Sequence, residues 1–327
     1  MDFKIVKAGM NDSNRRLDKI LRIYINNLPL SQIYKYLRKG LIKLNGKKAK
    51  PESKVLENDE ISIAAFILQD NELSANKENA SPNQKIKNDF EEIKIVFENK
   101  DILIIDKNYD LLVHGDKNSL DKKVVNYFKS KNTDLSLSFK PGPLHRLDKK
   151  TSGLLAFSMS LQGAKWFSEN LRNHNITKKY YSILQGNLKE SQKWEDFIDK
   201  NQLEGKLKDF HTVKISSQKE LNSKLALTFV KPLGHGLYKG QQITFVELDI
   251  KSGRTHQIRA QSSFHKHPLL GDIAYDGKKI NEERDFYLQA YKISFPKDNP
   301  LGLPQSIEIP LDSQFKKLLT ESNCKFD

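Results

Sequence analysis

The chain has 327 residues, of which 37% are hydrophobic, and its mean hydropathy of −0.63 excludes an integral membrane protein. Its single cysteine, Cys324, excludes an intramolecular disulfide framework and a cysteine-rich zinc module. The formal net charge of +14 favours a polyanionic partner such as nucleic acid, although a compositional bias toward lysine would give the same balance. The first residues lack the layout of a secretory signal, so we expect a cytoplasmic protein without a membrane partner.

The first part of the chain is predicted to contain two short helices. Apolar residues recur there at helical spacing, first Leu17, Ile20, Leu21 and Tyr24, then Leu30, Ile33, Tyr34 and Leu37. Ser31 is expected to cap the second helix and Gly40 to end it. A strand over 41–44, a turn at Asn45-Gly46 and a closing strand over 60–63 are expected to form a small sheet.

This first region is also basic. Residues 12–66 contain twelve Lys and Arg against six Asp and Glu. The region resembles the S-four RNA-binding domain in the segments Arg16-Leu17-Asp18-Lys19, Leu37-Arg38-Lys39-Gly40, Asn45-Gly46 and Asn58-Asp59-Glu60-Ile61. The resemblance implies RNA contacts from Arg16, Arg38, Lys39 and Lys43. From composition alone, a solvated basic face on a generic α/β module remains open.

A change of composition divides the chain. Residues 69–89 have almost no large apolar side chains, so this segment cannot bury enough surface to offset the entropy lost on ordering. We therefore predict a flexible linker over 69–89, between a small domain over 12–68 and a large domain over 90–320.

The densest polar segment of the large domain is His145-Arg146-Leu147-Asp148. The turn Thr151-Ser152-Gly153 and the apolar run 154–157 follow it. We expect the run to be a buried strand and the polar segment to be a loop at its edge. A carboxylate held in a rigid loop beside an arginine stays charged and oriented, as a nucleophile requires. The residues alone equally allow a structural ion pair between Arg146 and Asp148, which is the commoner arrangement.

Two later segments also carry polar groups next to predicted strands. Residues 178–186 alternate as in a strand that ends at Gly186, and their tyrosines belong either to the core or to a platform on which a base stacks. Residues 246–250 predict another strand, and a segment rich in hydrogen-bond donors follows over 253–259. The polar stretch 190–225 is interpreted as a solvated excursion between strands.

Together these segments resemble the signature motifs of the RluA-type pseudouridine synthases, and the basic module resembles that of the RluC-like subgroup. The resemblance implies an α+β fold: a small αL-type module of two helices and a small sheet, and a catalytic domain with a long mixed, mainly antiparallel sheet flanked by helices. It implies that Asp148 is the catalytic aspartate, that Tyr180 stacks on the target base and accepts a proton late in the reaction, and that Arg259 pairs with Asp148. Arg146 would help to displace the base, and Tyr181 would point to the other side of the strand.

The implied reaction converts specific uridines of large-subunit (23S) ribosomal RNA to pseudouridine, on a nucleotide flipped out of its stack. Asp148 would either attack C1′ or remove a proton from the sugar. The resemblance implies a monomer, no metal and no organic cofactor, with further RNA contacts from His145, Thr151, Arg254 and His256. The same chemistry on transfer RNA, and a non-catalytic RNA-binding factor for ribosome assembly, are the two alternatives.

The chain departs from the family pattern at two places. Lys107-Asn108-Tyr109-Asp110 stands where a Lys-Pro-x-Gly turn is common, and Gln261 stands where a histidine is common. The first departure questions the rigidity of the turn rather than the chemistry. His265 and His267 are spaced like two metal ligands, but no third ligand follows at a characteristic spacing, so no metal site is expected.

Overall fold

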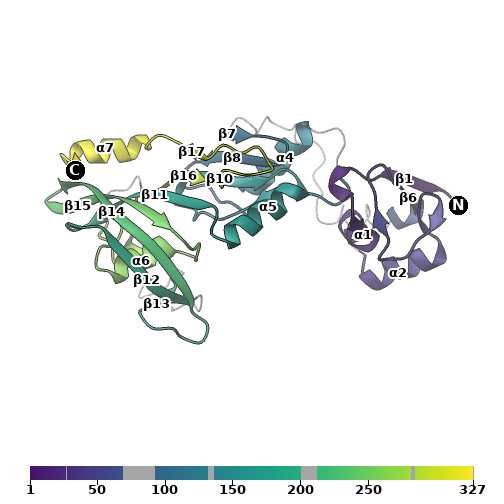
Figure 1. Cartoon of the computed structure of the whole chain (residues 1–327), viewed down its shortest axis with the longest axis horizontal. Coiled ribbons are helices and arrows are strands. Elements are labelled where there is room, and N and C mark those ends of the chain that lie inside the picture. Colours follow the sequence, from purple (N-terminus) through teal and green to yellow (C-terminus); the bar gives the residue numbers. More distant parts are fainter. Residues whose placement is uncertain (27, 69–92, 132–135, 200–211, 281–283, 327) are drawn as a thin grey trace. The chain divides into compact units, whose positions relative to one another are not determined.

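A computed structural model describes residues 1–26, 28–68, 93–131, 136–199, 212–280 and 284–326. The chain divides into two units (Figure 1). Unit 1 comprises residues 1–92, 121–142 and 158–163, and unit 2 comprises 93–120, 143–157 and 164–327. The predicted linker over 69–89 lies outside the described residues, and the domain limits 12–68 and 90–320 stay predictions.

Unit 1 contains a small sheet and two helices, as the sequence predicts. The sheet is antiparallel in the order β1-β6-β3-β4, with β1 at Phe3–Lys7, β3 at Ile42–Leu44, β4 at Lys47–Lys48 and β6 at Glu60–Ala64. The helices are α1 at Leu17–Tyr24 and α2 at Leu30–Lys39. The short elements are η1 at Met10–Asp12 and the paired strands β2 at Arg15–Arg16 and β5 at Lys54–Val55.

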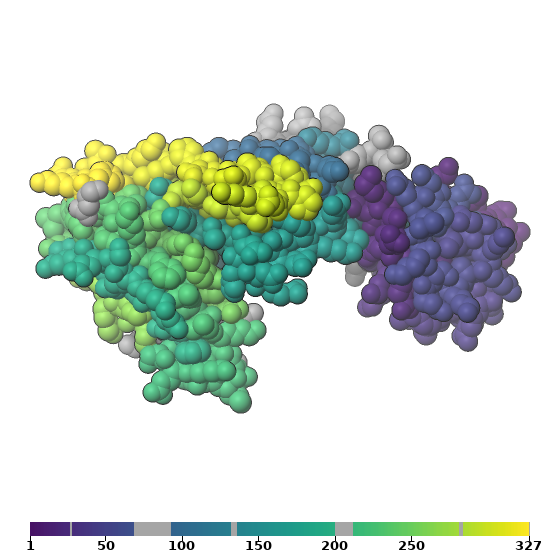
Figure 2. Space-filling model, in the orientation of Figure 1, coloured from purple at the N-terminus to yellow at the C-terminus, as the bar shows by residue number. Residues whose placement is uncertain are grey.

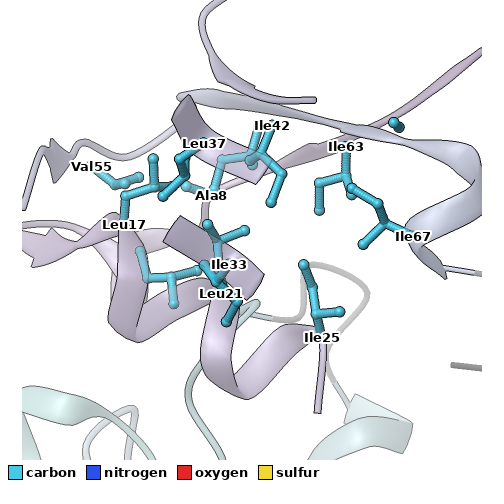
Figure 3. Close-up of a cluster of buried hydrophobic side chains, with 13 residues drawn as sticks. Ala8, Leu17, Leu21, Ile25, Ile33, Leu37, Ile42, Val55, Ile63 and Ile67 are labelled. Carbon is cyan, nitrogen blue, oxygen red and sulfur yellow. The ribbon is translucent and has the colours of Figure 1, made fainter. Parts of the chain in front are cut away.

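The apolar faces of the two helices meet the sheet in one buried cluster (Figure 3). Leu21 of α1, Leu37 of α2 and Ile42 of β3 are each almost completely buried. Burial of one such side chain stabilises the fold by about 1.5–3 kcal/mol, so the cluster accounts for the helical spacing of the apolar residues.

The predicted end of α2 is confirmed, but its predicted cap is wrong. Gly40 has a φ of 71°, a left-handed conformation that glycine adopts without a steric penalty at a helix end. The helix begins at Leu30 with Pro29 in the capping position, so Ser31 lies within the first turn. Proline fits just before the helix because its φ is already close to the helical value and no N–H is needed there.

Unit 1 also takes in a segment far along the sequence. The buried carboxylate of Asp12 accepts hydrogen bonds from the Ser136 hydroxyl at 2.7 Å and from the Leu137 and Ser138 N–H groups at 2.8 and 3.0 Å. It accepts another from the Gly9 N–H at 3.0 Å. These bonds offset the cost of removing the carboxylate from water. They connect residues about 125 positions apart, which no local pattern reveals.

Unit 2 is built on a long mixed sheet with the strand order β13-β12-β14-β15-β11-β16-β10-β8-β7. β10 runs parallel to β16, whereas the described pairs from β16 to β13 are antiparallel. The strands are β7 at Ile95–Glu98, β8 at Ile102–Lys107, β9 at Gly142–Pro143, β10 at Ser152–Ser158, β11 at Thr177–Gln185, β12 at Gln192–Asp199, β13 at Lys214–Ser216, β14 at Lys224–Tyr238, β15 at Gln241–Ile250, β16 at Leu288–Ser294, β17 at Ser306–Glu308 and β18 at Lys325–Phe326. The mainly antiparallel mixed sheet confirms the predicted fold class.

The helices of unit 2 are α6 at Gln257–Phe264, η3 at Ile273–Tyr275 and α7 at Ser313–Glu321, together with most of α5 at Leu161–Arg172. α4 at Leu120–Lys131 belongs, apart from Leu120, to unit 1. Figure 2 shows the end of the chain, in yellow, on the surface of unit 2, where Phe315 and Leu318 of α7 enter a buried cluster. Within the described ranges, no helix combines the length and the apolar character that crossing a bilayer requires.

The predicted strands at the polar motifs are confirmed, and one prediction is wrong. Every residue of β10 is buried, as the run 154–157 indicated, and β11 ends at Gln185, one residue before the predicted end at Gly186. The stretch 190–225 is not a solvated excursion throughout, because it contains the paired strands β12 and β13. Alternate residues of β12 face inward, and Trp194 is only 1% exposed, so the polar composition of the other face hid the strand.

Gly153 allows β10 to approach β16 closely. Its φ is +108°, and an added Cβ would lie 2.2 Å from the carbonyl oxygen of Ala290. We expect Gly153→Ala to lower the free energy of unfolding by at least about 2 kcal/mol, because both the backbone conformation and the contact become unfavourable. Urea unfolding followed by circular dichroism measures the change. Gly142→Ala is the matched control, since nothing lies within 4 Å of its added Cβ. Equal stabilities of the two variants would contradict the prediction.

Candidate active site

The loop that carries Asp148 is fixed by backbone hydrogen bonds at the edge of β10. The Thr151 N–H donates to the Asp148 carbonyl at 3.0 Å, and the Leu144 N–H donates to the Ala156 carbonyl at 2.8 Å. The first bond closes the loop just before β10, and the second joins the start of the loop to β10. The side chain of Asp148 remains 29% exposed, so it is held by the loop and still open to a ligand.

Lys107, at the end of β8, supports this loop from inside unit 2. Its ammonium donates to the carbonyl oxygens of Asn108 at 3.0 Å and of Leu111 and Lys149 at 2.9 Å. Burial lowers the pKa of Lys107 to about 8, and the charge of Asp148 opposes that shift. One cation thus fixes three carbonyls, one of them next to Asp148. No motif in the sequence points to this role for Lys107.

Arg259, on α6, faces the carboxylate of Asp148. Its Nη1 lies 3.8 Å from Asp148 Oδ2. The other side of the guanidinium donates to the buried carboxylate of Asp272, from Nε at 2.7 Å and from Nη2 at 2.8 Å. Tyr275 and Phe286 hold the guanidinium between their rings, with centroids 4.9 and 4.6 Å from its carbon. Burial alone would lower the pKa of Arg259, but the hydrogen bonds and charge of Asp272, together with Asp148, raise it.

His256 lies on the other oxygen of the same carboxylate. Its Nε2 is 3.9 Å from Asp148 Oδ1, and its Nδ1 is 2.9 Å from the hydroxyl of Tyr275. Burial lowers the pKa of His256, while the negative charge of Asp148 acts in the opposite direction. Burial raises the pKa of Tyr275 to about 12, so its hydroxyl keeps a proton that it can donate to Nδ1. That donation leaves the imidazole proton on Nε2, toward Asp148.

Tyr180 enters the site from β11. The residue is 4% exposed, and burial, followed by the charge of Asp148, raises the pKa of its phenol far above the usual range. The phenol therefore keeps its proton at neutral pH. The next residue, Tyr181, points to the other face of the sheet as predicted, where its ring stacks on Tyr291 at 3.7 Å.

These groups line one cleft of unit 2, with a volume of about 1320 Å³. The predicted site residues that line this cleft are His145, Arg146, Asp148, Thr151, Tyr180, Arg254, His256 and Arg259. They come from the loop before β10, from β11, and from α6 with the loop before it. Space of this size accepts a nucleotide, and the mixture of apolar walls and a few polar groups is typical of a ligand site.

The cleft residues differ in the exposure of their side chains and in their hydrogen bonds within the protein. His145 is buried, stacks on Phe167, and accepts the N–H of Ala156 at Nε2. Burial, aided by the charge of Lys178, lowers its pKa to about 3, so it stays neutral. Arg254 donates through Nε to the carbonyl of Leu225, whereas Arg146 is exposed. Their RNA contacts stay predictions.

The other predicted RNA-binding residues lie in unit 1, outside this cleft. Arg38 and Lys39 are exposed at the end of α2, and Lys43 lies over the ring of Phe3 at 4.8 Å. Arg16 donates from Nε and Nη2 to the carboxylate of Asp18, at 3.1 and 2.8 Å. The guanidinium of Arg16 is therefore already engaged within the module. All four RNA contacts stay predictions.

Both departures from the family pattern have structural explanations. In the turn after Lys107, the Lys107 ammonium bonds to the carbonyls of Asn108 and Leu111, which holds the turn without the proline and glycine. Gln261 is buried and bonds to Thr228 and Asp196, at 2.6 and 2.7 Å, so it joins α6 to β14 and β12. His265 lies 2.9 Å from Asp196 and His267 lies 3.1 Å from the Gln185 carbonyl, so the two imidazoles have separate partners. In the described part of the chain, no three His, Cys, Asp or Glu side chains are grouped closely enough to hold a metal ion.

Comparison with known proteins gives two family matches. The family described as RNA pseudouridylate synthase matches residues 101–264, and the S4 domain family matches residues 15–61. Together the two matches include α1, α2, Asp148, Tyr180 and Arg259.

Individual relatives cover nearly the whole chain. An uncharacterized RNA pseudouridine synthase of Mycoplasma capricolum is 29% identical over 96% of this chain and 96% of its own. Ribosomal large subunit pseudouridine synthase D of Vibrio parahaemolyticus is 28% identical over 81% and 74%, and synthase C of Escherichia coli K12 is 26% identical over 97% and 95%. The solved structure of human RNA pseudouridylate synthase domain containing 1 has a TM-score of 0.56 and 26% identity, over 76% of this chain and 91% of that one.

The proximity of His256 to Asp148 predicts a measurable coupling. Since the charge of Asp148 favours the protonated imidazole, Asp148→Asn is expected to lower the pKa of His256 further. Titration of the imidazole nitrogens by NMR between pH 4 and 8 would record the shift. Asp276→Asn, which changes an exposed carboxylate bonded to Ser263, serves as the control. An unchanged pKa of His256 in the Asp148 variant would contradict the observed arrangement.

Proposed function

The chain belongs to the RNA pseudouridylate synthase family, and on this premise we propose that it converts specific uridines of large-subunit ribosomal RNA to pseudouridine. The observation that carries the proposal is the carboxylate of Asp148, 3.8 Å from the Arg259 guanidinium in a cleft that Tyr180 also lines. The relatives named as ribosomal large subunit synthases C and D favour ribosomal RNA as the substrate.

Asp148 acts on the sugar of the target uridine. The reaction breaks the N1–C1′ bond, turns the base, and joins C5 to C1′, while C5 loses a proton and N1 gains one. The ionised carboxylate either attacks C1′ or removes a sugar proton, and both routes need a negative charge held in place. Arg259 faces this charge, and Asp272 fixes the guanidinium from its other side. The net change is an isomerisation, so it needs no oxidant, energy source or organic cofactor.

Tyr180 serves as the platform for the flipped base. Extruding the nucleotide costs a few kcal/mol of unstacking, and stacking on an aromatic ring returns about 1–3 kcal/mol. Because burial raises the pKa of its phenol, Tyr180 supports the base in its protonated form and is poorly suited to accept the proton from C5. This assignment narrows the role that the family resemblance suggests for this residue.

The proposal includes the oligomeric state, the cellular compartment and the choice of RNA. All the groups named in the cleft belong to one chain, so a monomer is sufficient. An isomerisation on ribosomal RNA suits an enzyme of the cytoplasm that uses no metal. Transfer RNA remains the alternative substrate, and it is less favoured because the relatives named by substrate are ribosomal. A non-catalytic assembly factor would not need Asp148, Tyr180 and Arg259 together in one cleft.

Asp148→Asn tests the assignment of the carboxylate. We expect tritium release from large-subunit RNA containing 5-tritiated uridine to fall by at least about 1000-fold, because the variant supplies neither nucleophile nor base. The dissociation constant for the RNA should change less than about threefold. Asp110→Asn, which alters a surface carboxylate paired with Lys149 and Lys150, should keep its turnover. Turnover by the Asp148 variant at the wild-type rate would refute the proposed chemistry.

The basic end of α2 tests the RNA-binding role of unit 1. The double variant Arg38→Gln, Lys39→Gln should bind the same RNA more weakly and lower the slope of log affinity against log salt by about 1–2. The reason is that binding releases fewer counterions from the RNA when a phosphate contact is lost. Lys316→Gln, Lys317→Gln on α7 removes the same charge from another exposed helix and controls for net charge. Identical salt slopes in both double variants would show that α2 is not an RNA contact.

A further inference from the structure

The side chain of Lys178 is a largely buried cation that lines the cleft, and the chemistry proposed above assigns it no role. It lies on β11, two residues before Tyr180, and both side chains line the cleft. Residues two apart on a strand face the same side of the sheet. Lys178 is 8% exposed, so its ammonium lies deep in the cleft beside the position proposed for the target base.

The ammonium of Lys178 lacks a protein partner. Throughout the described residues, no hydrogen bond or ion pair reaches its Nζ, in contrast to the ammonium of Lys107 with its three carbonyls. A Cβ added at Gly253 would lie 3.6 Å from Nζ. The ammonium is thus beside the backbone of the loop that brings Arg254 and His256 into the cleft.

A largely buried charge without a protein partner is unfavourable, and such groups are typical of sites where a ligand of opposite charge binds. Burial lowers the pKa of Lys178 to about 8. At pH 7 the amine therefore remains protonated by roughly ten to one. Among the described residues, no Asp or Glu carboxylate lies within ion-pair distance of the Lys178 ammonium. The charge is available to an anion that arrives with the substrate.

We propose that the Lys178 ammonium binds an anionic oxygen of the nucleotide that enters the cleft. The inference rests on the proposed function and deepens it. Two sources supply such an oxygen. One is a phosphate of the target nucleotide, and the other is a carbonyl oxygen of uracil, which becomes anionic when the N1–C1′ bond breaks.

The charge balance explains why the uracil oxygen needs a cation. When the N1–C1′ bond breaks, its electron pair stays on the base and spreads over N1, O2 and O4. If Asp148 attacks C1′, its negative charge is used in the new bond, so the charge passes from the carboxylate to the base. Lys178 lies on the strand beneath that base and neutralises the charge without transferring a proton. When C5 bonds to C1′, the bond between C1′ and Asp148 breaks and the negative charge returns to the carboxylate. C5 then loses its proton and N1 gains one, so the base ends neutral.

Lys178→Met tests the proposal, with Lys179→Met as the matched control. Lys179 is adjacent on β11, but its ammonium pairs with Glu247 at 2.7 Å, and it does not line the cleft. Two quantities are measured at pH 7: the dissociation constant for a ten-residue oligouridylate, and single-turnover tritium release from large-subunit RNA at saturating enzyme.

The two measurements distinguish a phosphate oxygen from a uracil oxygen. Binding of a phosphate predicts a dissociation constant raised about fivefold or more and a salt slope lowered by about 0.7. Binding of a uracil oxygen predicts an unchanged dissociation constant and a single-turnover rate lowered about 10–1000-fold. If both quantities stay within twofold of wild type in a folded Lys178→Met protein, the proposal is overturned.

The pH dependence tests the proposal without a destabilising substitution. In the wild type, the affinity for the oligouridylate or the single-turnover rate, whichever depends on Lys178, should decline as pH rises above about 8, because the amine loses the charge that holds the anion. Lys178→Arg, which stays charged, should move this decline to higher pH. A rate that instead rises through about pH 8 and loses that rise in Lys178→Arg would make Lys178 a general base and overturn the proposal.

Failure of the substrate assignment would be visible separately. If the wild type releases tritium from transfer RNA and none from large-subunit RNA, the proposed substrate is wrong, and the same variants are compared on transfer RNA. The oligouridylate measurement does not depend on turnover, so it reports on Lys178 in either case.

Discussion

The guanidinium of Arg259 is the group on which the geometry of the cleft depends. Asp272 takes two of its N–H groups and leaves Nη1 directed at Asp148, while Tyr275 and Phe286 fix the plane of the group. A buried ion pair stabilises little overall because desolvation opposes the attraction, but loss of one member leaves a costly charge. The arrangement therefore specifies where the guanidinium lies more than it stabilises the fold, and that position determines what faces the substrate.

The long sheet brings this group and the carboxylate of Asp148 together. Asp148 precedes β10, and Arg259 lies in the first turn of α6, which follows β15. In the sheet, β10 and β15 are separated by β16 and β11. Tyr180 on β11 lies between them in strand order, and its side chain lines the same cleft as Asp148 and Arg259. The close approach at Gly153 sets the distance between β10 and β16, so a backbone constraint outside the polar groups helps to position them.

The spacing of apolar residues predicted the helices of unit 1 and the buried strand β10. Leu21 and Leu37 lie on the apolar faces of α1 and α2, and the run 154–157 lies in a fully buried strand. The prediction for 190–225 failed because β12 is polar on one face, and averaging over the stretch concealed the inward residues. The partners of the site residues were not predictable, because Asp272, Tyr275 and Lys107 act through contacts that depend on tertiary packing. The resemblance to a family supplied the residues proposed to touch the substrate, but not those that hold them in place.

Lys107, Arg259 and Lys178, three cations of the site, differ in the groups that pair with their charges. Lys107 is satisfied by backbone carbonyls and has no capacity left for a ligand, so its role is to shape the loop. Arg259 divides its donors between Asp272 and Asp148 and so connects the fold to the chemistry. Lys178 lines the cleft and has no partner among the described residues. If an anionic oxygen of the nucleotide binds there as proposed, Lys178 is the one of these three cations whose charge the substrate itself would balance.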